Sequence, residues 1–359
     1  MRFFEHQEAA RWQTRRLLMA FAVSVLLVVG AVHGALALAW YALAIVGEAL
    51  LPVSFPFPTG FLAVNVGVSL LLVLGGWWVE TSQLRAGGLR FARRIGAREA
   101  WPGVSFAEQR FCNVLEELCI AGGIEPPQPM VLTRTDAINA FAAGWDESDD
   151  VLAVTQGALD LLTREELQGL VAHELSHLRE GDTRLNMRLA GMVFGLELVY
   201  NFGDSLRERG GLGRWFGTAV MAAGWAGWFT GRLLKAAVSR QREYLADARA
   251  VQWTRSRDGL GGVLRKVMTQ LHDSPSRRAD RGGLDHPALR HMLLVPAGNE
   301  GRLAQRLASH PTLEKRIFRI YGRSMGPLPL AGVQGEPVEA AEMPVDPAPA
   351  SAPGSLTLV

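Results

Sequence analysis

The run His173-Glu174-Leu175-Ser176-His177 places two imidazoles and a carboxylate at a spacing that can bind and use a metal. Residues four apart lie on one face of an α-helix, so His173 and His177 can converge on one Zn²⁺, whose nitrogen ligands sit roughly 2.0–2.1 Å away. Glu174 directly follows the first ligand and would lie beside the open coordination position. There it could take a proton from an attacking water and pass it to a leaving amine. A chance match is the alternative, and the uncharged residues around the motif favour the metal site.

A second segment, Ser239–Ala248, supplies a candidate third ligand. Its sequence predicts a helix in which Glu243 and Asp247 share one face. A carboxylate would complete the two-histidine, one-glutamate set of catalytic zinc sites, and Asp247 could accept the free imidazole N–H of a ligating histidine. The alternative is a solvated helix face whose carboxylates pair with Arg240 or Arg249.

The two segments together resemble the integral-membrane zinc metallopeptidases of the HtpX and CAAX prenyl protease type. Three further pieces resemble that family in the same chain order: Asn139 to Gly144, Glu180-Gly181-Asp182, and His310-Pro311 with Arg316-Ile317. The resemblance covers roughly residues 85–322. It implies a mostly helical α+β fold, with a zincin-like core, a small sheet and transmembrane helices, and one Zn²⁺ per chain.

The resemblance also implies roles for residues outside the motif. Asn139, Ala140 and Phe141 would bind substrate, and His310 would stabilise the oxyanion of the tetrahedral intermediate. The alternative for His310 is that it merely begins the helix that follows it. We interpret Asp182 as a structural cap or network residue.

Two apolar stretches near the N-terminus predict a membrane hairpin. Residues 17–46 carry no charge and are long enough to cross a hydrocarbon core of about 30 Å, and a second span runs from about Phe61 to Val79. Arginines precede the first span and follow the second, so the positive-inside rule places the N-terminus and the following domain in the cytoplasm. A cleaved signal peptide ending near Ala37 is the alternative, but the apolar stretch continues beyond that residue.

Two more apolar segments, Leu189 to Phe202 and Trp215 to Gly231, lie between the metal motif and Glu243. The first is short for a span, and arginines occupy the loop between the two. The family resemblance favours a second membrane hairpin. The alternatives are an internal helical hairpin and one that dips into the near leaflet.

The remaining pattern predicts the surroundings of the motif. A helix over 105–122, strands at Met130–Leu132 and Val151–Val154, and a capping box at Thr163 would frame the metal helix. An edge strand of this sheet could pair with an extended peptide. Cys112 and Cys119 are expected to be reduced thiols.

These observations predict a membrane-anchored zinc endopeptidase of the bacterial inner membrane, with its active site facing the cytoplasm. Its partners would be unfolded or membrane polypeptides and the lipid bilayer, and no pattern points to nucleic acid. A narrow-specificity processing protease, a non-catalytic zinc-containing scaffold or chaperone, and a transporter are the alternatives. The expected domains are a cytoplasmic segment (1–16), two transmembrane helices (17–81), the peptidase domain (82–325, with 189–231 as the membrane-hairpin candidate) and a disordered Pro/Ala-rich tail (326–359).

Overall fold

Two long helices open the chain. The computed structural model describes residues 2–273, 293–294 and 311–330; it places α1 at Arg2–Leu50 and α2 at Phe61–Leu84. Helix α1 begins well before the expected span because residues 2–16 contain no Pro or Gly to interrupt it. Within the described residues, α2 and the part of α1 from Leu18 to Leu50 are the two helices that are long and apolar enough to cross a membrane.

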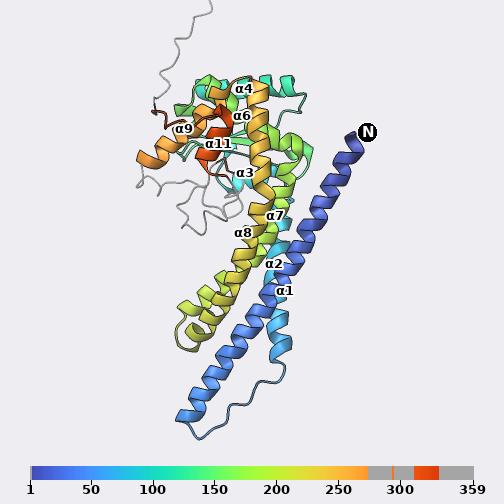
Figure 1. Ribbon diagram of the computed structural model, residues 1–359, viewed down its shortest axis with the longest axis vertical. Coiled ribbons are helices and arrows are strands. Elements are labelled where there is room, and N and C mark those ends of the chain that lie inside the picture. The colour runs from blue at the N-terminus through green and yellow to red at the C-terminus, as the bar shows by residue number, and fades with distance from the viewer. Residues whose placement is uncertain (1, 274–292, 295–310, 331–359) are drawn as a thin grey trace, which may run out of the picture.

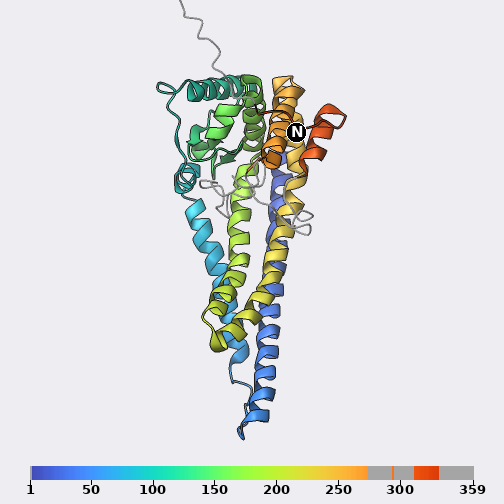
Figure 2. The ribbon, with the colours of Figure 1, turned by 90° about the vertical axis from the view of Figure 1, so that its left-hand side faces the viewer.

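A second helical hairpin packs along the first (Figures 1 and 2). Helix α7 (Asp182–Glu208) packs against α2, and α8 (Gly211–Thr254) packs against both α7 and α1. Glycine allows the close approach of these helices, because a Cβ at Gly195 would overlap the carbonyl of Val73 in α2. The apolar segments at 189–202 and 215–231 therefore lie beside the N-terminal hairpin, and their insertion into a membrane stays a prediction.

Helix α8 continues without a break from the second apolar segment to the candidate third ligand. The sequence predicted 215–231 and the helix at Ser239–Ala248 as separate segments, whereas one 44-residue helix contains both. No Pro or Gly lies between Gly231 and Glu243 to end the helix. One rigid element thus connects the bundle to the metal motif.

A four-stranded sheet, with the strand order β1-β2-β4-β3, lies above the helical bundle in the view of Figure 2. Strands β2 and β4 are parallel, and the edge strands β1 and β3 pair antiparallel with them. The strands are β1 (Arg98–Glu99), β2 (Gln128–Leu132), β3 (Ala140–Ala143) and β4 (Val151–Thr155). The helices around them are α3 (Gly88–Arg94), α4 (Phe106–Gly122), α5 (Gln156–Leu161), α6 (Arg164–Glu180), α9 (Arg257–Asp273) and α11 (Leu313–Tyr321), with a 3-10 turn at Glu147–Asp149.

Helix α6, which carries the metal motif, lies in the centre of this domain. It contacts β3 and β4, α4, α8 and α9, and its apolar residues Leu167, Leu170, Val171 and Leu175 are fully buried. Burial on several sides explains why apolar residues surround the three titratable groups of the metal motif, His173, Glu174 and His177.

The structure confirms the predicted fold class, which is a mostly helical α+β arrangement with a small sheet. Helix α4 and strands β2 and β4 lie where the sequence predicted them, and Cys112 and Cys119 are free thiols. His310 and residues 331–359 of the predicted tail lie outside the described residues.

Candidate metal centre and active site

The start and the end of α6 are both fixed by local interactions. The Thr163 side chain accepts a hydrogen bond from the Glu166 backbone, and the Glu166 carboxylate accepts one of 2.8 Å from the Thr163 N–H, which confirms the predicted capping box. Glu166 also pairs with the buried Lys266 at 2.7 Å. At the other end, Gly181 adopts φ 69°, which ends the helix about one turn after the motif.

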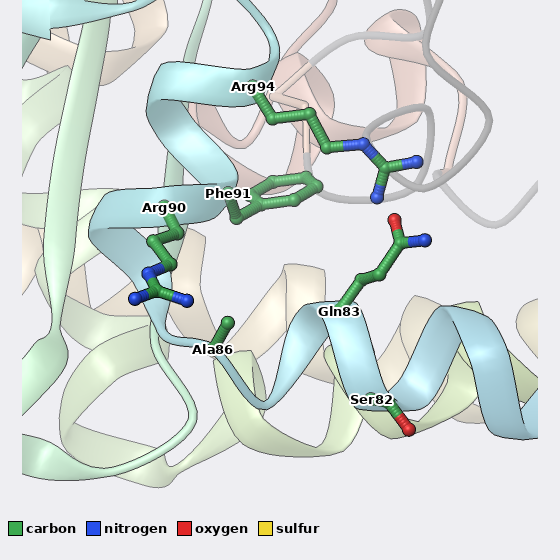
Figure 3. Close-up of a pocket in the computed structure, with 6 residues that line it drawn as sticks. All are labelled: Ser82, Gln83, Ala86, Arg90, Phe91 and Arg94. Carbon is green, nitrogen blue, oxygen red and sulfur yellow. The ribbon is translucent and has the colours of Figure 1, made fainter.

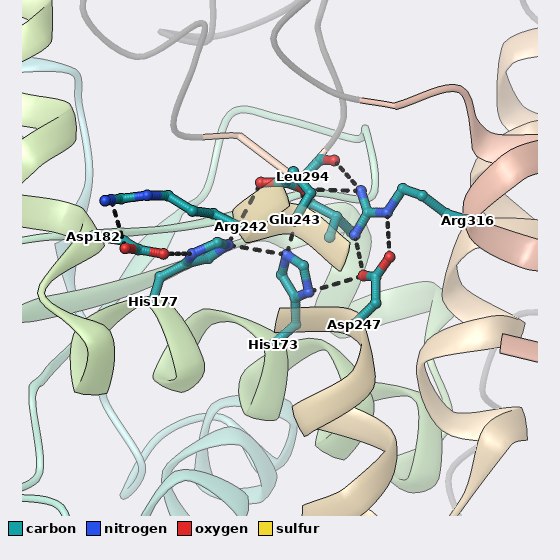
Figure 4. A network of polar contacts seen from close by, with 8 residues as sticks. All are labelled: His173, His177, Asp182, Arg242, Glu243, Asp247, Leu294 and Arg316. Carbon is teal, nitrogen blue, oxygen red and sulfur yellow. Dashed lines mark hydrogen bonds and ion pairs between the residues drawn. The ribbon is translucent and has the colours of Figure 1, made fainter. Parts of the chain in front are cut away.

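The candidate ligands converge at one point between α6 and α8 (Figure 4). The Nε2 atoms of His173 and His177 lie 3.3 Å apart. Glu243 Oε1 lies 3.5 Å from the Nε2 of His177, and its Oε2 lies 3.8 Å from the Nε2 of His173. All three residues are predominantly buried, and their ligand atoms lie within 4.8 Å of one another. The structure therefore brings together the three residues that the sequence predicted as metal ligands.

A carboxylate lies behind each imidazole. Asp182 Oδ2 is 3.0 Å from Nδ1 of His177, and Asp247 Oδ1 is 3.2 Å from Nδ1 of His173. The Asp247 contact departs from ideal hydrogen-bond geometry, yet it still favours the charged form of His173. Both carboxylates favour a proton on Nδ1, which leaves the Nε2 lone pairs directed at each other and at Glu243.

This donor set fits a zinc ion. Three converging lone-pair donors repel one another unless a proton or a metal cation lies among them. Two tetrahedral ligands at roughly 2.0–2.1 Å from zinc would lie about 3.3 Å apart, which matches the observed separation of the two Nε2 atoms. The Mn²⁺, Mg²⁺ and Ca²⁺ ions favour oxygen ligands, whereas two imidazoles and one carboxylate are typical of catalytic zinc.

Arg316 of α11 holds the carboxylates of α8 in place. Its guanidinium donates to both oxygens of Asp247, at 2.6 and 2.9 Å, and donates to the Leu294 carbonyl at 2.9 Å. The Nη1 atom of Arg316 also lies 3.3 Å from Oε2 of Glu243. Arg316 is fully buried, so these contacts replace water as its partners. The charge of Arg316 therefore orients the third ligand and the group that supports His173.

Burial and the neighbouring charges together shift the pKa values of the two histidines in opposite directions. Burial lowers the pKa of His173, even though Asp247 favours its charged form. Burial also lowers the pKa of His177, but Asp182 and Glu243 outweigh it and raise the value to about 9. Burial raises the pKa of Asp247, and the Arg316 charge reverses that effect and lowers it. These directions describe the protein's own charges, to which a cation would add.

Glu174 is almost completely buried beside the ligands. Burial raises the pKa of its carboxyl to about 7, and the backbone of Ala142 opposes this shift by hydrogen bonding to it. A group of this pKa can both accept and donate a proton near neutrality. The link to β3 also fixes the carboxyl relative to the edge of the sheet.

The three residues predicted to bind substrate surround the start of β3, but their side chains are buried. The Asn139 side chain accepts from the Ala140 N–H at 3.0 Å, and Phe141 packs edge-on against Phe91 at 6.2 Å. Their contribution to substrate binding would therefore come from the backbone. The Ala140 carbonyl points away from β4 and accepts the Leu294 N–H at 3.3 Å.

Three residues position the candidate ligands in ways that the sequence patterns did not predict. Arg316 appeared only within a family motif, and Arg242 was not considered, although it donates to Asp182 Oδ1 at 2.6 Å. Asp182 is the network residue that we expected, but Gly181, not Asp182, is the N-cap of α7. Asp182 follows His177 by five residues, across the glycine that ends α6, and this spacing could have predicted that its carboxylate contacts His177.

The chain is similar in sequence to known metallopeptidases. The family model described as "Peptidase family M48" matches residues 107–324. A "Protease HtpX homolog" of Dictyoglomus thermophilum is 37% identical over 219 residues, covering 60% of this chain and 68% of the relative. A homologue of the same name from Pyrococcus abyssi is 28% identical over 270 residues, covering 73% and 86%.

Among solved structures, the crystal structure of S. mikatae Ste24p matches with a TM-score of 0.36 and 14% sequence identity, covering 85% of this chain and 66% of that one. The family match extends over more than half of the chain and includes α6, the ligand-bearing part of α8 and α11. The chain therefore belongs to peptidase family M48 and is a metalloprotease.

Proposed function

We propose that this protein is a membrane-anchored zinc endopeptidase that holds one Zn²⁺ per chain. The observation that supports this most strongly is the convergence of His173, His177 and Glu243, with Glu174 buried beside them. These three side chains would hold the ion. When bound, zinc acts as a Lewis acid on a scissile carbonyl and an attacking water.

The chain's own residues would carry the proton transfers. Glu174 takes a proton from the attacking water and delivers it to the leaving amine, and its pKa of about 7 suits both steps. Asp182 and Asp247 keep the imidazoles oriented with Nε2 toward the ion. Arg316 keeps Glu243 and Asp247 in place, and its charge favours the ionised form of Asp247.

Substrate would bind as an extended strand along β3. Backbone pairing accepts many sequences, which suits a protease with unfolded substrates. Because the Ala140 carbonyl already accepts the Leu294 N–H, a peptide that pairs there must displace Leu294. His310 would stabilise the oxyanion of the tetrahedral intermediate, as the family resemblance implies.

The helical bundle would anchor the enzyme in a bacterial inner membrane. The apolar part of α1 and α2 would cross it, with α7 and α8 inserted beside them as a second hairpin. Arginines at positions 85, 90, 93, 94 and 98 follow α2, so the positive-inside rule places the peptidase domain in the cytoplasm. Substrates of this location would be unfolded or misassembled membrane proteins, which is a quality-control role.

Cleavage of an unfolded protein tests this proposal. The purified full-length chain, supplied with zinc in detergent, should cut reduced casein at internal peptide bonds, as mass spectrometry of the fragments would show. Glu174→Gln should lose at least about a thousandfold of the rate, because the base is removed without changing the shape of the site. Glu165→Gln, on the exposed first turn of the same helix, is the matched control. Equal rates for wild type and Glu174→Gln would contradict the proposal, and cleavage restricted to one short sequence would indicate a processing protease instead.

A further inference from the structure

A pocket of about 400 Å³ lies where α2 ends and α3 begins, away from the metal centre (Figure 3). It is lined by Ser82, Gln83, Ala86, Arg90, Phe91 and Arg94. The last turn of α2 forms one wall and α3 forms the other, with Phe91 between the two arginines. None of the catalytic residues takes part in it.

The pocket is positively charged. Arg90 and Arg94 are exposed, and none of the lining residues is acidic. Glu80 offsets part of this charge, because its Oε1 lies 3.5 Å from Nη1 of Arg94. Glu80 is buried, however, and only one carboxylate stands against two guanidinium groups. Arg90 therefore provides the larger share of the uncompensated charge.

The position of the pocket along α2 matches the boundary of a bilayer. The apolar part of α2 from Phe61 to Val79 contains 19 residues, which at about 1.5 Å each span about 28 Å and nearly cover a hydrocarbon core. Ser82 and Gln83 follow about one turn later, and the exposed Trp78 lies at the depth typical of interfacial tryptophans. Arg90 and Arg94 then lie at the level of the lipid headgroups.

The exposed surface next to the pocket suits an acyl chain. Trp78 and Val79 continue into a row of exposed apolar residues along one face of α2, which comprises Val64, Val68, Leu71 and Leu74. A molecule with a phosphate at one end and hydrocarbon at the other could contact both surfaces at once. Free phosphate would use only the arginines.

We propose that this pocket binds the phosphate headgroup of an anionic membrane lipid. Arg90 and Arg94 donate to the phosphate oxygens, for which planar guanidinium groups are well suited, and Gln83 offers its amide N–H. Basic pockets on the cytoplasmic side of membrane helices recognise such headgroups. The inference rests on the membrane insertion of α2, not on peptidase activity.

Such a lipid would stabilise α3, which connects helix α2 to the sheet. Helix α3 packs tightly on the strands, because a Cβ at Gly88 would overlap the carbonyls of Ala143 and Asp149. Phe91 contacts Phe141 of β3 with ring centroids 6.2 Å apart. The headgroup would therefore hold α3, and with it β3, at a fixed place relative to α2.

Native mass spectrometry of the full-length protein in detergent tests the proposal. The probes are dioctanoyl-phosphatidylglycerol, dioctanoyl-phosphatidylcholine and inorganic phosphate. We expect one phosphatidylglycerol adduct that forms in preference to phosphatidylcholine, and that Arg90→Gln weakens by about tenfold. Arg90→Lys should restore part of the binding, because it keeps the charge.

Arg93→Gln is the matched control, because Arg93 lies on the same helix, outside the pocket, and pairs with the exposed Glu99 at 2.6 Å. It should bind phosphatidylglycerol as the wild type does. Equal binding of the two lipids, or equal loss in Arg90→Gln and Arg93→Gln, would overturn the proposal. Displacement of phosphatidylglycerol by millimolar inorganic phosphate would also overturn it, since the site would then recognise free phosphate.

Discussion

Arg316 donates hydrogen bonds to both carboxylate oxygens of Asp247, at 2.6 and 2.9 Å, in the buried interior of the peptidase domain. The two residues are 69 positions apart in sequence, and they join α11 to the helix that carries Glu243, the proposed third metal ligand. The charges are mutually dependent, because either one alone would be buried without a partner.

Replacement of Arg316 should therefore destabilise the domain. Arg316→Ala is expected to lower the free energy of unfolding by about 3–5 kcal/mol, since it leaves the buried carboxylate of Asp247 without its cationic partner. Chemical unfolding monitored by tryptophan fluorescence measures the loss. Lys315→Ala, at an exposed position of the same helix, should change the value by less than about 0.5 kcal/mol. Equal stability of the two variants would show that the buried ion pair is not important for the fold.

Asp182 should determine how tightly His177 binds metal. Asp182→Asn removes the charge that orients Nδ1 of His177 and is expected to weaken zinc affinity by about 10–100-fold. Competition against a chelator of known affinity measures this change. Asp160→Asn, at an exposed position on α5, serves as the control. Unchanged affinity in Asp182→Asn would remove this residue from the metal site.

Removal of zinc should destabilise the folded protein. A ligand that binds only the native state, at 100 times its dissociation constant, contributes about 2.7 kcal/mol. Treatment with a chelator should thus lower the thermal midpoint, and added zinc should restore it in the wild type and in Glu174→Gln. A midpoint that does not respond to zinc in either protein would argue against a formed site.

The two cysteines should resist alkylation in the native protein. Burial raises the pKa of the Cys119 thiol to about 11, so about one molecule in ten thousand carries the reactive thiolate at pH 7. Burial also raises the pKa of Cys112. N-ethylmaleimide should label both residues after unfolding, and the slow native labelling should become faster as the pH rises. Rapid labelling of Cys119 at pH 7 would contradict the packing of α4.

Local sequence patterns predicted those parts of the site that depend on neighbouring residues. The four-residue spacings place His173 with His177 and Glu243 with Asp247, and the capping box at Thr163 fixes where α6 begins. The link between Arg316 and Asp247 could not be predicted in this way, because it depends on how α11 packs against α8.

The arrangement of the helical bundle was also beyond local patterns. Hydropathy separated 215–231 from the polar segment around Glu243, although one helix contains both. The packing of α7 on α2 depends on close approach at Gly195, which hydropathy does not record. Neither this packing nor the hydropathy of α7 and α8 tests whether the hairpin is inserted in a membrane, so its insertion stays a prediction.

Zinc content tests the central claim most directly. The purified wild type and Glu174→Gln should each retain one zinc ion per chain after dialysis, whereas Glu243→Ala should lose most of it, because Glu243, and not Glu174, is the proposed ligand. Inductively coupled plasma mass spectrometry, referred to protein concentration from amino-acid analysis, gives the ratio. Full zinc occupancy in Glu243→Ala would contradict the proposed metal centre.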